Sequence, residues 1–255
     1  MSGVPLAVVI LAAGRGRRLG PDGDDLPKWF LPVGRRTIAD WQLDGLRRSA
    51  GLWSRLLVVT GHRADLFDGV ALGAELVHNE EYASRNNWYS LRLALPRLST
   101  DAWEGSVCVL NSDLLIGPRV LGHFLEAAAR DGRSLLAVDT EAPRTDEQMK
   151  VALDEAGERV VDIGKGTLTA PPAGEYVGLA KIDARDVPAL ERILDSFLED
   201  PARADEWYEA AFREAMQTGV EFGVVPVDPG RWIEIDDGDD LERARALAAE
   251  LEEED

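Results

Sequence analysis

The chain has 255 residues, 45% of them hydrophobic, and a formal net charge of −19 at pH 7. This size is enough for the core of one α/β domain, while the large negative charge excludes nucleic acid as a partner, because the phosphate backbone would be repelled. No apolar run approaches the ~18 residues that a membrane-spanning helix needs, which excludes a membrane partner.

Apolar runs alternate with amphipathic segments along the chain, which is typical of a mostly parallel sheet with crossover helices. In chain order, strands are expected over 6–13, 55–60, 74–78, 106–110, 134–139, 176–182, 220–227 and 232–235, and helices over 37–49, 88–95, 120–130, 187–198, 204–218 and 239–250. Pro96 is expected to stop the helix before it, and a hairpin is expected over 150–163 with its turn at 154–157. The single cysteine, Cys108, falls in an expected strand as a core thiol, which favours a reducing, cytoplasmic location.

These elements predict a single domain over residues 1–255, built as a three-layer α/β/α sandwich. A small β insertion is expected at about residues 140–185. Within it, the segment 164–174 is rich in Pro, Gly and Thr and is expected to form a surface loop or lid.

A glycine- and arginine-rich loop follows the first expected strand. Gly14 and Gly16 allow the backbone to turn sharply and to present its N–H groups to phosphate oxygens. Arg18 adds a permanent cation whose planar fork suits phosphate. The small side chains of Ala12 and Ala13 leave room for a flat base beside the chain. The loop therefore predicts a nucleotide-phosphate site.

Lys28 lies ten residues beyond Arg18, far enough for the loop to fold back over a triphosphate. Other phosphate loops fit less well. A dinucleotide-binding Gly-x-Gly-x-x-Gly would need glycine where Leu19 stands, and the Gly-Lys-Ser/Thr of a P-loop is absent from this sequence. A plain glycine turn with solvated arginines is disfavoured, because the strand, the paired alanines and the lysine occur together.

Two carboxylates stand at the ends of distant expected strands. Asp113 follows an apolar run at 107–110, and Asp236 follows the run at 232–235. In a parallel sheet the carboxyl ends of the strands open onto one crevice, so we expect the two side chains to converge. Carboxylate oxygens suit Mg²⁺, which binds through one or two carboxylates and substrate phosphates. We therefore predict a Mg²⁺ site, and we assign Asp240 to the start of the last helix.

Residues 11–19, together with Pro27 and Lys28, resemble the signature of the sugar-1-phosphate nucleotidyltransferases and related enzymes. The resemblance implies a Rossmann-like, GT-A-like fold and the transfer of a nucleotidyl group from an NTP to a phosphorylated acceptor, with release of pyrophosphate. It implies catalytic roles for Arg18 and Lys28. The residues that it places on the nucleotide are Leu11, Ala12, Ala13, Gly14, Gly16, Arg18, Lys28 and Asp113.

The segment 79–91 resembles the Asn-x-x-Tyr…Asn-x-x-Ser-Leu segment of bacterial phosphocholine cytidylyltransferases and their phosphonate and polyol-phosphate relatives. By itself this segment reads as a polar loop that caps the next helix. In the wider fold it contacts the nucleotide base, so the resemblance implies base contacts from Asn87 and Ser90. An amide and a hydroxyl can pair with the edge of cytosine, which favours CTP. The segment 234–241 matches a late Glu-Ile-Asp segment of the same family and supports Asp236 as a metal ligand.

Residues 146–178 resemble the acceptor half of the same cytidylyltransferases, although a hairpin with solvated charges would explain them without the resemblance. The acceptor-binding candidates are Lys150 for the acceptor phosphate, Glu175 and Tyr176 for the pocket wall, and Tyr208 as a cation–π surface for a quaternary amine. Lys165, Trp207 and Trp232 are further candidates at the same end, with Glu209 nearby.

The expected activity is cytidylyl transfer from CTP to a small phosphorylated or phosphonate acceptor, such as phosphocholine or 2-aminoethylphosphonate. A sugar- or polyol-1-phosphate nucleotidyltransferase is the first alternative, and a catalytically silent nucleotide-binding regulatory module is another. A glycosyltransferase is disfavoured, because residues 111–113 read Asn-Ser-Asp where such enzymes carry Asp-x-Asp. The sequence does not decide between a monomer and a homodimer.

Overall fold

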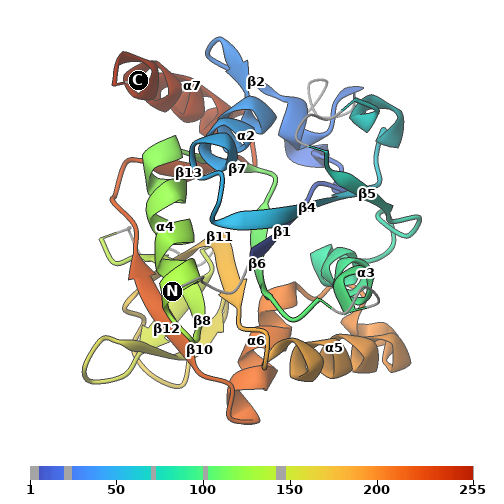
Figure 1. Ribbon diagram of the computed structural model, residues 1–255, viewed down its shortest axis with the longest axis vertical. Helices are drawn as coiled ribbons and strands as arrows, with labels where there is room; N and C mark the ends of the chain where they lie inside the picture. The colour runs from blue at the N-terminus through green and yellow to red at the C-terminus, as the bar shows by residue number, and fades with distance from the viewer. Residues whose placement is uncertain (1–5, 20–24, 70–72, 100–102, 142–147, 255) are drawn as a thin grey trace.

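The computed structural model describes residues 6–19, 25–69, 73–99, 103–141 and 148–254. Within these residues, nine strands form one mixed sheet (Figure 1). In spatial order the strands are β5 (Glu75–His78), β4 (Trp53–Thr60), β1 (Leu6–Leu11), β6 (Ser106–Asn111), β11 (Gly174–Ile182), β8 (Ser134–Asp139), β12 (Phe222–Pro226), β10 (Arg159–Gly164) and β9 (Lys150–Leu153).

The sheet combines parallel and antiparallel pairs. The four strands β5, β4, β1 and β6 are parallel to one another, and β12 is parallel to β8. Strand β11 runs antiparallel to both β6 and β8, and the expected hairpin is present as β9 and β10. The parallel half, which starts with β1, carries the glycine loop at its carboxyl edge.

Helices cover both faces of the sheet. On one face lie α2 (Ile38–Arg48), α4 (Pro118–Arg130) and α7 (Gly238–Glu253), and on the other lie α3 (Asn87–Ser99), α5 (Val187–Ser196) and α6 (Tyr208–Gln217). Strand β1 alternates between the two resulting cores: Leu6, Val8 and Ile10 pack into the first, and the residues between them into the second. The expected three-layer sandwich is confirmed.

Short elements complete the described chain. Two small sheets pair β7 (Leu114–Ile116) with β13 (Trp232–Glu234), and β2 (Pro32–Val33) with β3 (Arg36–Thr37). The 3₁₀ turns are η1 (Arg17–Leu19), η2 (Lys28–Phe30), η3 (Ala64–Phe67), η4 (Phe197–Glu199) and η5 (Pro201–Arg203). Among the described helices, none has the length and apolar character needed to traverse a bilayer.

Two expected helix boundaries were wrong. Helix α3 continues through Pro96 to Ser99, because Leu95 and Leu98 are buried and hold its last turn against the core despite the missing N–H. Helix α6 begins at Tyr208 and not at residue 204, because Trp207 has an extended backbone, with φ −92° and ψ 157°.

The expected reason for the meeting of Asp113 and Asp236 was also wrong. Strand β13 does not join the large sheet. It pairs antiparallel with β7, which begins directly after Asp113, and the N–H of Ile235 donates to the carbonyl of Asp113 at 3.0 Å. A local two-stranded sheet therefore brings the two carboxylates together.

Candidate functional site

A cavity of about 310 Å³ opens beyond the carboxyl ends of β1 and β6. Its wall is formed by the glycine loop, the start of α3, the turn between β6 and β7, strand β11 and the segment between β13 and α7. The predicted site residues that line it are Leu11, Ala13, Gly14, Arg18, Lys28, Asn87, Ser90, Asp113, Tyr176 and Asp236.

Lys28 links the two predicted carboxylates. Its Nζ lies 2.7 Å from Oδ1 of Asp236 and 3.1 Å from Oδ2 of Asp113, and Nη1 of Arg18 lies 3.2 Å from the other oxygen of Asp236. Burial alone would lower the pKa of Lys28, but the charges of Asp113 and Asp236 outweigh it and raise this pKa above its usual value. The ammonium therefore stays charged within the cavity.

Glu234 is a third carboxylate at this point. It offers an oxygen that lies, with those of Asp113 and Asp236, within a group whose members are all within 4.8 Å of one another. Burial, followed by the two neighbouring negative charges, raises the pKa of Glu234 to about 8. Glu234 was not among the predicted site residues, although the sequence carries a signal for it. Residues two apart in an extended strand point to the same side, so Glu234 accompanies Asp236 while Ile235 faces the core.

A buried hydrogen-bonded bridge connects the segment of Lys28 to the turn of Asp113. Nε1 of Trp29 donates to Oε1 of Gln42 at 2.9 Å, and Nε2 of Gln42 donates to the carbonyls of Asn111 at 2.9 Å and Leu114 at 2.8 Å. Gln42 is fully buried on α2. In the sequence it is one polar residue of an amphipathic helix, and nothing marked it as part of the site.

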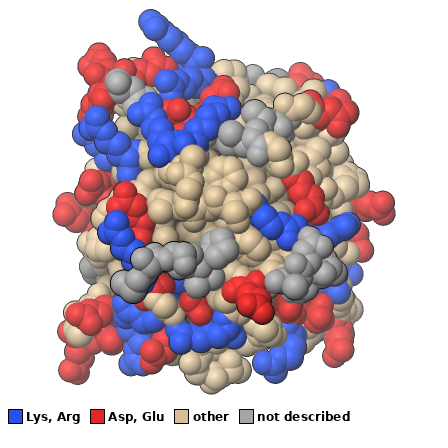
Figure 2. Space-filling view, viewed as in Figure 1, with Lys and Arg blue, Asp and Glu red and all other residues tan. Residues whose placement is uncertain are grey.

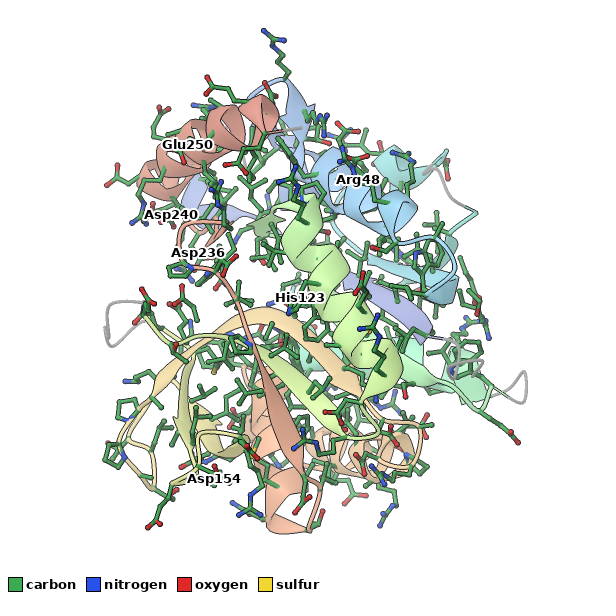
Figure 3. The ribbon with its side chains drawn as sticks, turned by 60° about the vertical axis from the view of Figure 1, so that its left-hand side comes forward. Arg48, His123, Asp154, Asp236, Asp240 and Glu250 are labelled. Atoms are coloured by element: carbon green, nitrogen blue, oxygen red, sulfur yellow. The ribbon has the colours of Figure 1, made fainter. Side chains whose placement is uncertain are left out.

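The start of α7 fixes Asp236. Asp240 accepts the backbone N–H of Asp236 at 2.9 Å, and Asp237 and Asp240 form a capping box at the first turn of the helix. Figure 3 shows Asp236 and Asp240 close together at the foot of α7. The assignment of Asp240 to the start of the last helix is confirmed.

The start of α3 brings two side chains with hydrogen-bond donors, those of Asn87 and Ser90, to the cavity wall. Nδ2 of Asn79 donates to Oγ of Ser90 at 3.0 Å, and Oδ1 of Asn87 accepts the backbone N–H of Tyr208, also at 3.0 Å. With their acceptor sides engaged in this way, Asn87 and Ser90 keep an amide nitrogen and a hydroxyl proton for a ligand.

Strand β11 approaches the carboxyl end of β6 closely. Gly178 has a φ of +82°, and a Cβ at this position would lie 2.8 Å from Nδ2 of Asn111, so only glycine fits here. Oδ1 of Asn111 accepts the hydroxyl of Tyr208 at 3.0 Å, and the hydroxyl of Tyr176 lies 2.9 Å from that of Tyr208. This chain of polar groups supports the floor of the cavity.

Tyr208 does not line the cavity, unlike its neighbours Trp207 and Glu209. It is fully buried at the start of α6, where its ring packs 5.1 Å from that of Phe212. The structure therefore gives Tyr208 a supporting position behind Tyr176, and no face for a cation.

Two further acceptor candidates lie beside the cavity. Lys150 borders a separate depression that it shares with Lys165 and residues 166–172. Glu175 accepts Nε2 of Gln148 at 2.6 Å, and burial together with the charge of Asp139 raises its pKa to about 7.

Of the remaining predicted residues, Ala12 and Gly16 form backbone hydrogen bonds, and others lie outside the described residues. The N–H of Ala12 donates to the carbonyl of Val59 at 2.8 Å, which extends the ladder of β1, and the carbonyl of Gly16 accepts the N–H of Leu19 at 3.0 Å. Asp146 and Glu147, at the start of the acceptor-like segment, lie outside the described residues.

An aromatic and acidic wall closes the cavity at the side of α6. Nζ of Lys165 lies 4.8 Å from the ring centroid of Trp207, and Glu209 lies two residues further along the chain. Burial raises the pKa of Glu209 to about 7, while Lys165 lowers it and Asp113 adds to the rise. Both protonation states of Glu209 are therefore accessible near neutral pH.

Comparisons with known proteins relate the chain to nucleotidyltransferases. A family model of the MobA-like NTP transferase domain matches residues 8–215. The choline-phosphate cytidylyltransferase of Streptococcus pneumoniae is 32% identical over 96 residues, which cover 37% of this chain and 41% of that protein. The CMP-5'-(3-aminopropyl)phosphonate synthase of Streptomyces rubellomurinus is 29% identical over 94% of this chain and 38% of that protein. The matches thus span about two fifths of the length of each relative.

Solved structures share the fold over nearly the whole chain. The CTP:phosphocholine cytidylyltransferase from Streptococcus pneumoniae has a TM-score of 0.75 at 18% identity and covers 96% of this chain and 99% of its own. The inositol-1-phosphate CTP transferase from T. maritima has a TM-score of 0.74 at 20% identity and covers 99% of this chain and 98% of its own. At these identities the likeness shows a nucleotidyltransferase fold.

Proposed function

The chain belongs to the MobA-like NTP transferase domain family, and on this basis we propose that it transfers a cytidylyl group from CTP to a small phosphorylated or phosphonate acceptor. Phosphocholine and 2-aminoethylphosphonate represent the acceptor class. The relatives named for choline phosphate and for an aminopropylphosphonate support this choice.

One observation carries the proposal. Two cations of the glycine-loop region, Arg18 and Lys28, meet the carboxylates of Asp113 and Asp236 in one cavity. A triphosphate needs both kinds of group, because cations bind its oxygens directly and carboxylates bind the divalent ion that accompanies it. A purely structural ion-pair network would have no reason to line an open cavity next to a glycine loop.

In the proposed reaction, a phosphate or phosphonate oxygen of the acceptor attacks the α-phosphorus of CTP. The new bond joins this oxygen to the α-phosphorus, and the bond from the α-phosphorus to the oxygen bridging to the β-phosphorus breaks. Pyrophosphate leaves with that oxygen. The attacking oxygen is already ionised, so no general base is required, and catalysis consists of positioning and charge stabilisation.

The chain's own groups have distinct parts in this step. The backbone around Gly14 binds phosphate oxygens, and Arg18 and Lys28 stabilise the charge that develops on the pyrophosphate. Asp113 and Asp236, joined by Glu234, would hold Mg²⁺, because a group of carboxylates without cysteine or histidine is the donor set that this ion prefers. When bound, Mg²⁺ would neutralise part of the triphosphate charge.

Base selection is assigned to the start of α3. The amide nitrogen of Asn87 and the hydroxyl of Ser90 are donors, and the ring nitrogen and carbonyl oxygen of cytosine are acceptors. This match supports CTP over nucleotides whose pairing edge presents a donor at the same place.

A matrix of nucleotides and acceptors tests the proposal. Pyrophosphate release is measured with each of CTP, UTP, ATP and GTP, against phosphocholine, 2-aminoethylphosphonate and a hexose 1-phosphate, with Mg²⁺. The expected result is release with CTP and an amine-bearing acceptor. Release with the hexose 1-phosphate alone would reassign the acceptor class, and tight CTP binding without release for any acceptor would indicate a regulatory module.

A further inference from the structure

A buried oxygen in the cavity has no partner within the part of the chain that the structure describes. Glu209 is 4% exposed and lines the cavity, and its Oε2 makes no hydrogen bond to any described residue. Leaving a buried carboxylate oxygen unpaired is unfavourable, so such an oxygen facing a cavity indicates a ligand that donates a hydrogen bond.

The surroundings of Glu209 indicate the charge of that ligand. Glu209 and Glu234 are both partly or wholly buried carboxylates at this side of the cavity, and the cation that acts on both of them is Lys165. The charge of Asp113 is balanced by its ion pair with Lys28, which also acts on Glu234, so the buried carboxylate of Glu209 is the negative charge that faces this wall. A ligand with a positive charge would therefore be favoured here over a neutral one.

Lys165 already places an ammonium group at this wall of the cavity. The ammonium of Lys165 lies 4.8 Å from the ring centroid of Trp207, and 39% of Trp207 is exposed. An indole face favours any cation, whether or not it carries N–H groups. The unpaired oxygen of Glu209 is more selective, because only a cation with an N–H can satisfy it.

We propose that the acceptor carries an ammonium group with at least one N–H, and that Oε2 of Glu209 accepts its hydrogen bond. This inference rests on the proposed function and narrows its acceptor class. Trimethylammonium has no N–H, so a choline-type acceptor would bury Oε2 without a partner. A site built around a hydrogen bond discriminates strongly against an analogue that lacks the donor. We expect a preference of about 10- to 100-fold in kcat/KM, the range for one hydrogen bond to a charged group.

A methylation series tests the inference in the wild-type protein. The acceptors are 2-aminoethyl phosphate and its N-methyl, N,N-dimethyl and N,N,N-trimethyl derivatives, and pyrophosphate release is measured with CTP and Mg²⁺. The first three keep an N–H at neutral pH, so their kcat/KM should stay within a few-fold, and the loss should come at the third methyl. An equal or faster reaction of the trimethyl compound would overturn the inference. An even decline with each methyl would overturn it too, since that pattern reports volume.

Variants at Glu209 separate this role from others. Glu209→Leu should remove the preference, by lowering kcat/KM for 2-aminoethyl phosphate to that of the trimethyl compound while KM for CTP is unchanged. Glu209→Gln keeps an acceptor oxygen and should retain part of the preference, which guards against a Leu variant that folds poorly. A rise in KM for CTP in place of the acceptor effect would assign Oε2 to the nucleotide and contradict the inference.

Direct binding distinguishes failure of this inference from failure of the proposed function. Calorimetric titration compares 2-aminoethylphosphonate with its trimethyl analogue, in the presence of CTP and Ca²⁺. If no pair of substrates releases pyrophosphate but the primary amine binds at least tenfold more tightly, the reaction is wrong and the ammonium site stands. Equal binding of the two compounds refutes the site, whatever the turnover.

Discussion

The ammonium of Lys28 pairs with two carboxylates that would hold Mg²⁺ in the proposed reaction. Its ammonium is 2.7 Å from Asp236 and 3.1 Å from Asp113, and Arg18 pairs with the remaining oxygen of Asp236. The same four side chains thus neutralise one another before a nucleotide is present. Charge complementarity of this kind keeps a cluster of acidic groups from repelling the triphosphate.

Asp236 is the residue whose loss should separate chemistry from folding. Asp236→Asn removes the charge that both Lys28 and Arg18 contact, while the backbone bond to Asp240 remains. Turnover should fall by about 10²-fold or more, the effect of losing one preorganised charged group. Pyrophosphate release measures this effect, and thermal unfolding should show a midpoint within a few degrees of the wild type.

Asp154→Asn is the matched control for Asp236→Asn. Asp154 lies in the turn of the β9–β10 hairpin, and Figure 3 places it at the far end of the molecule from Asp236. Its replacement should leave turnover unchanged. Full activity of Asp236→Asn would refute the carboxylate cluster as the site of metal-assisted transfer.

Arg18 should act on the reaction more than on the fold. Its side chain is 68% exposed and, among the described residues, pairs with Asp236, so Arg18→Ala should leave the unfolding midpoint nearly unchanged. If the guanidinium meets the charge that develops on the leaving pyrophosphate, kcat should fall by about 10²-fold. Steady-state kinetics with Arg35→Ala as an exposed control measures this, and an equal loss in both variants would assign Arg18 to the solvated surface.

Residues inside short motifs were predictable, and residues joined only by the fold were not. Gly14, Arg18 and Lys28 lie within a short stretch of the sequence, and the structure brings all three to one cavity. Gln42 reaches the site from the buried face of a helix, and no local pattern distinguishes it there from other polar residues. Tyr208 was placed on a binding face by its aromatic character alone, but helix geometry turns it into the core.

At the scale of elements, the site depends on how η2, α2 and the turn after β6 are held together. Gln42 on α2 is the link: it accepts from Trp29, next to Lys28, and donates to the carbonyls of Asn111 and Leu114 in the turn that carries Asp113. These bonds are buried, so each partner left unpaired would cost about 1–3 kcal/mol.

Gln42→Leu should therefore affect both stability and catalysis. The free energy of unfolding should fall by at least about 2 kcal/mol, measured in urea, because buried polar groups lose their partners. Because Lys28 and Asp113 are then less well aligned, kcat should fall by about tenfold or more, while KM for the acceptor changes little.

Lys181→Met is the control for a merely structural effect. Lys181 is also buried and donates to the carbonyls of Asp131 and Arg133, but it lies at the other end of β11 from the cavity. The Lys181→Met variant should lose about as much free energy of unfolding as Gln42→Leu and should keep the kcat of the wild type. Equal losses of kcat in Gln42→Leu and Lys181→Met would refute a positioning role for Gln42.

Elements with a strong hydrophobic pattern were predicted correctly from the sequence. Features that depend on tertiary packing were not. Strand β1 was predictable from its continuous apolar run, and helix α4 from its amphipathicity. Helix α3 outlasts Pro96 because the core holds its final turn. The partner of β13 is β7, more than a hundred residues earlier, and a pairing so distant leaves no local pattern to read.

At the scale of the whole molecule, charged groups of both signs are spread over the surface and also meet in the cavity. Figure 2 shows acidic and basic side chains interspersed around the edge of one face, with an uncharged area in its middle. The net charge of −19 therefore does not come from a single patch on this face. The buried carboxylates of the cavity add a component that depends on pH in a definite direction.

Stability of the protein without divalent ions should fall as the pH rises through 7. The pKa of Glu175 and that of Glu209 are both raised from 4.5 to about 7, chiefly by burial. The folded state then binds more protons than the unfolded state between these values, so the free energy of unfolding decreases with increasing pH. The stabilisation is complete below about pH 4.5 and is lost as both groups ionise in the fold near pH 7.

Thermal unfolding from pH 5.5 to 8.5, at constant ionic strength and with a chelator, measures this dependence. The double variant Glu175→Gln/Glu209→Gln should flatten the decline, because neither amide ionises. Glu250→Gln on the exposed face of α7 removes a charge without removing a buried ionisation, so its pH profile should match that of the wild type. A decline of undiminished slope in the double variant would show that the two glutamates do not ionise in the fold near pH 7. The charges inferred for the acceptor side of the cavity would then be wrong.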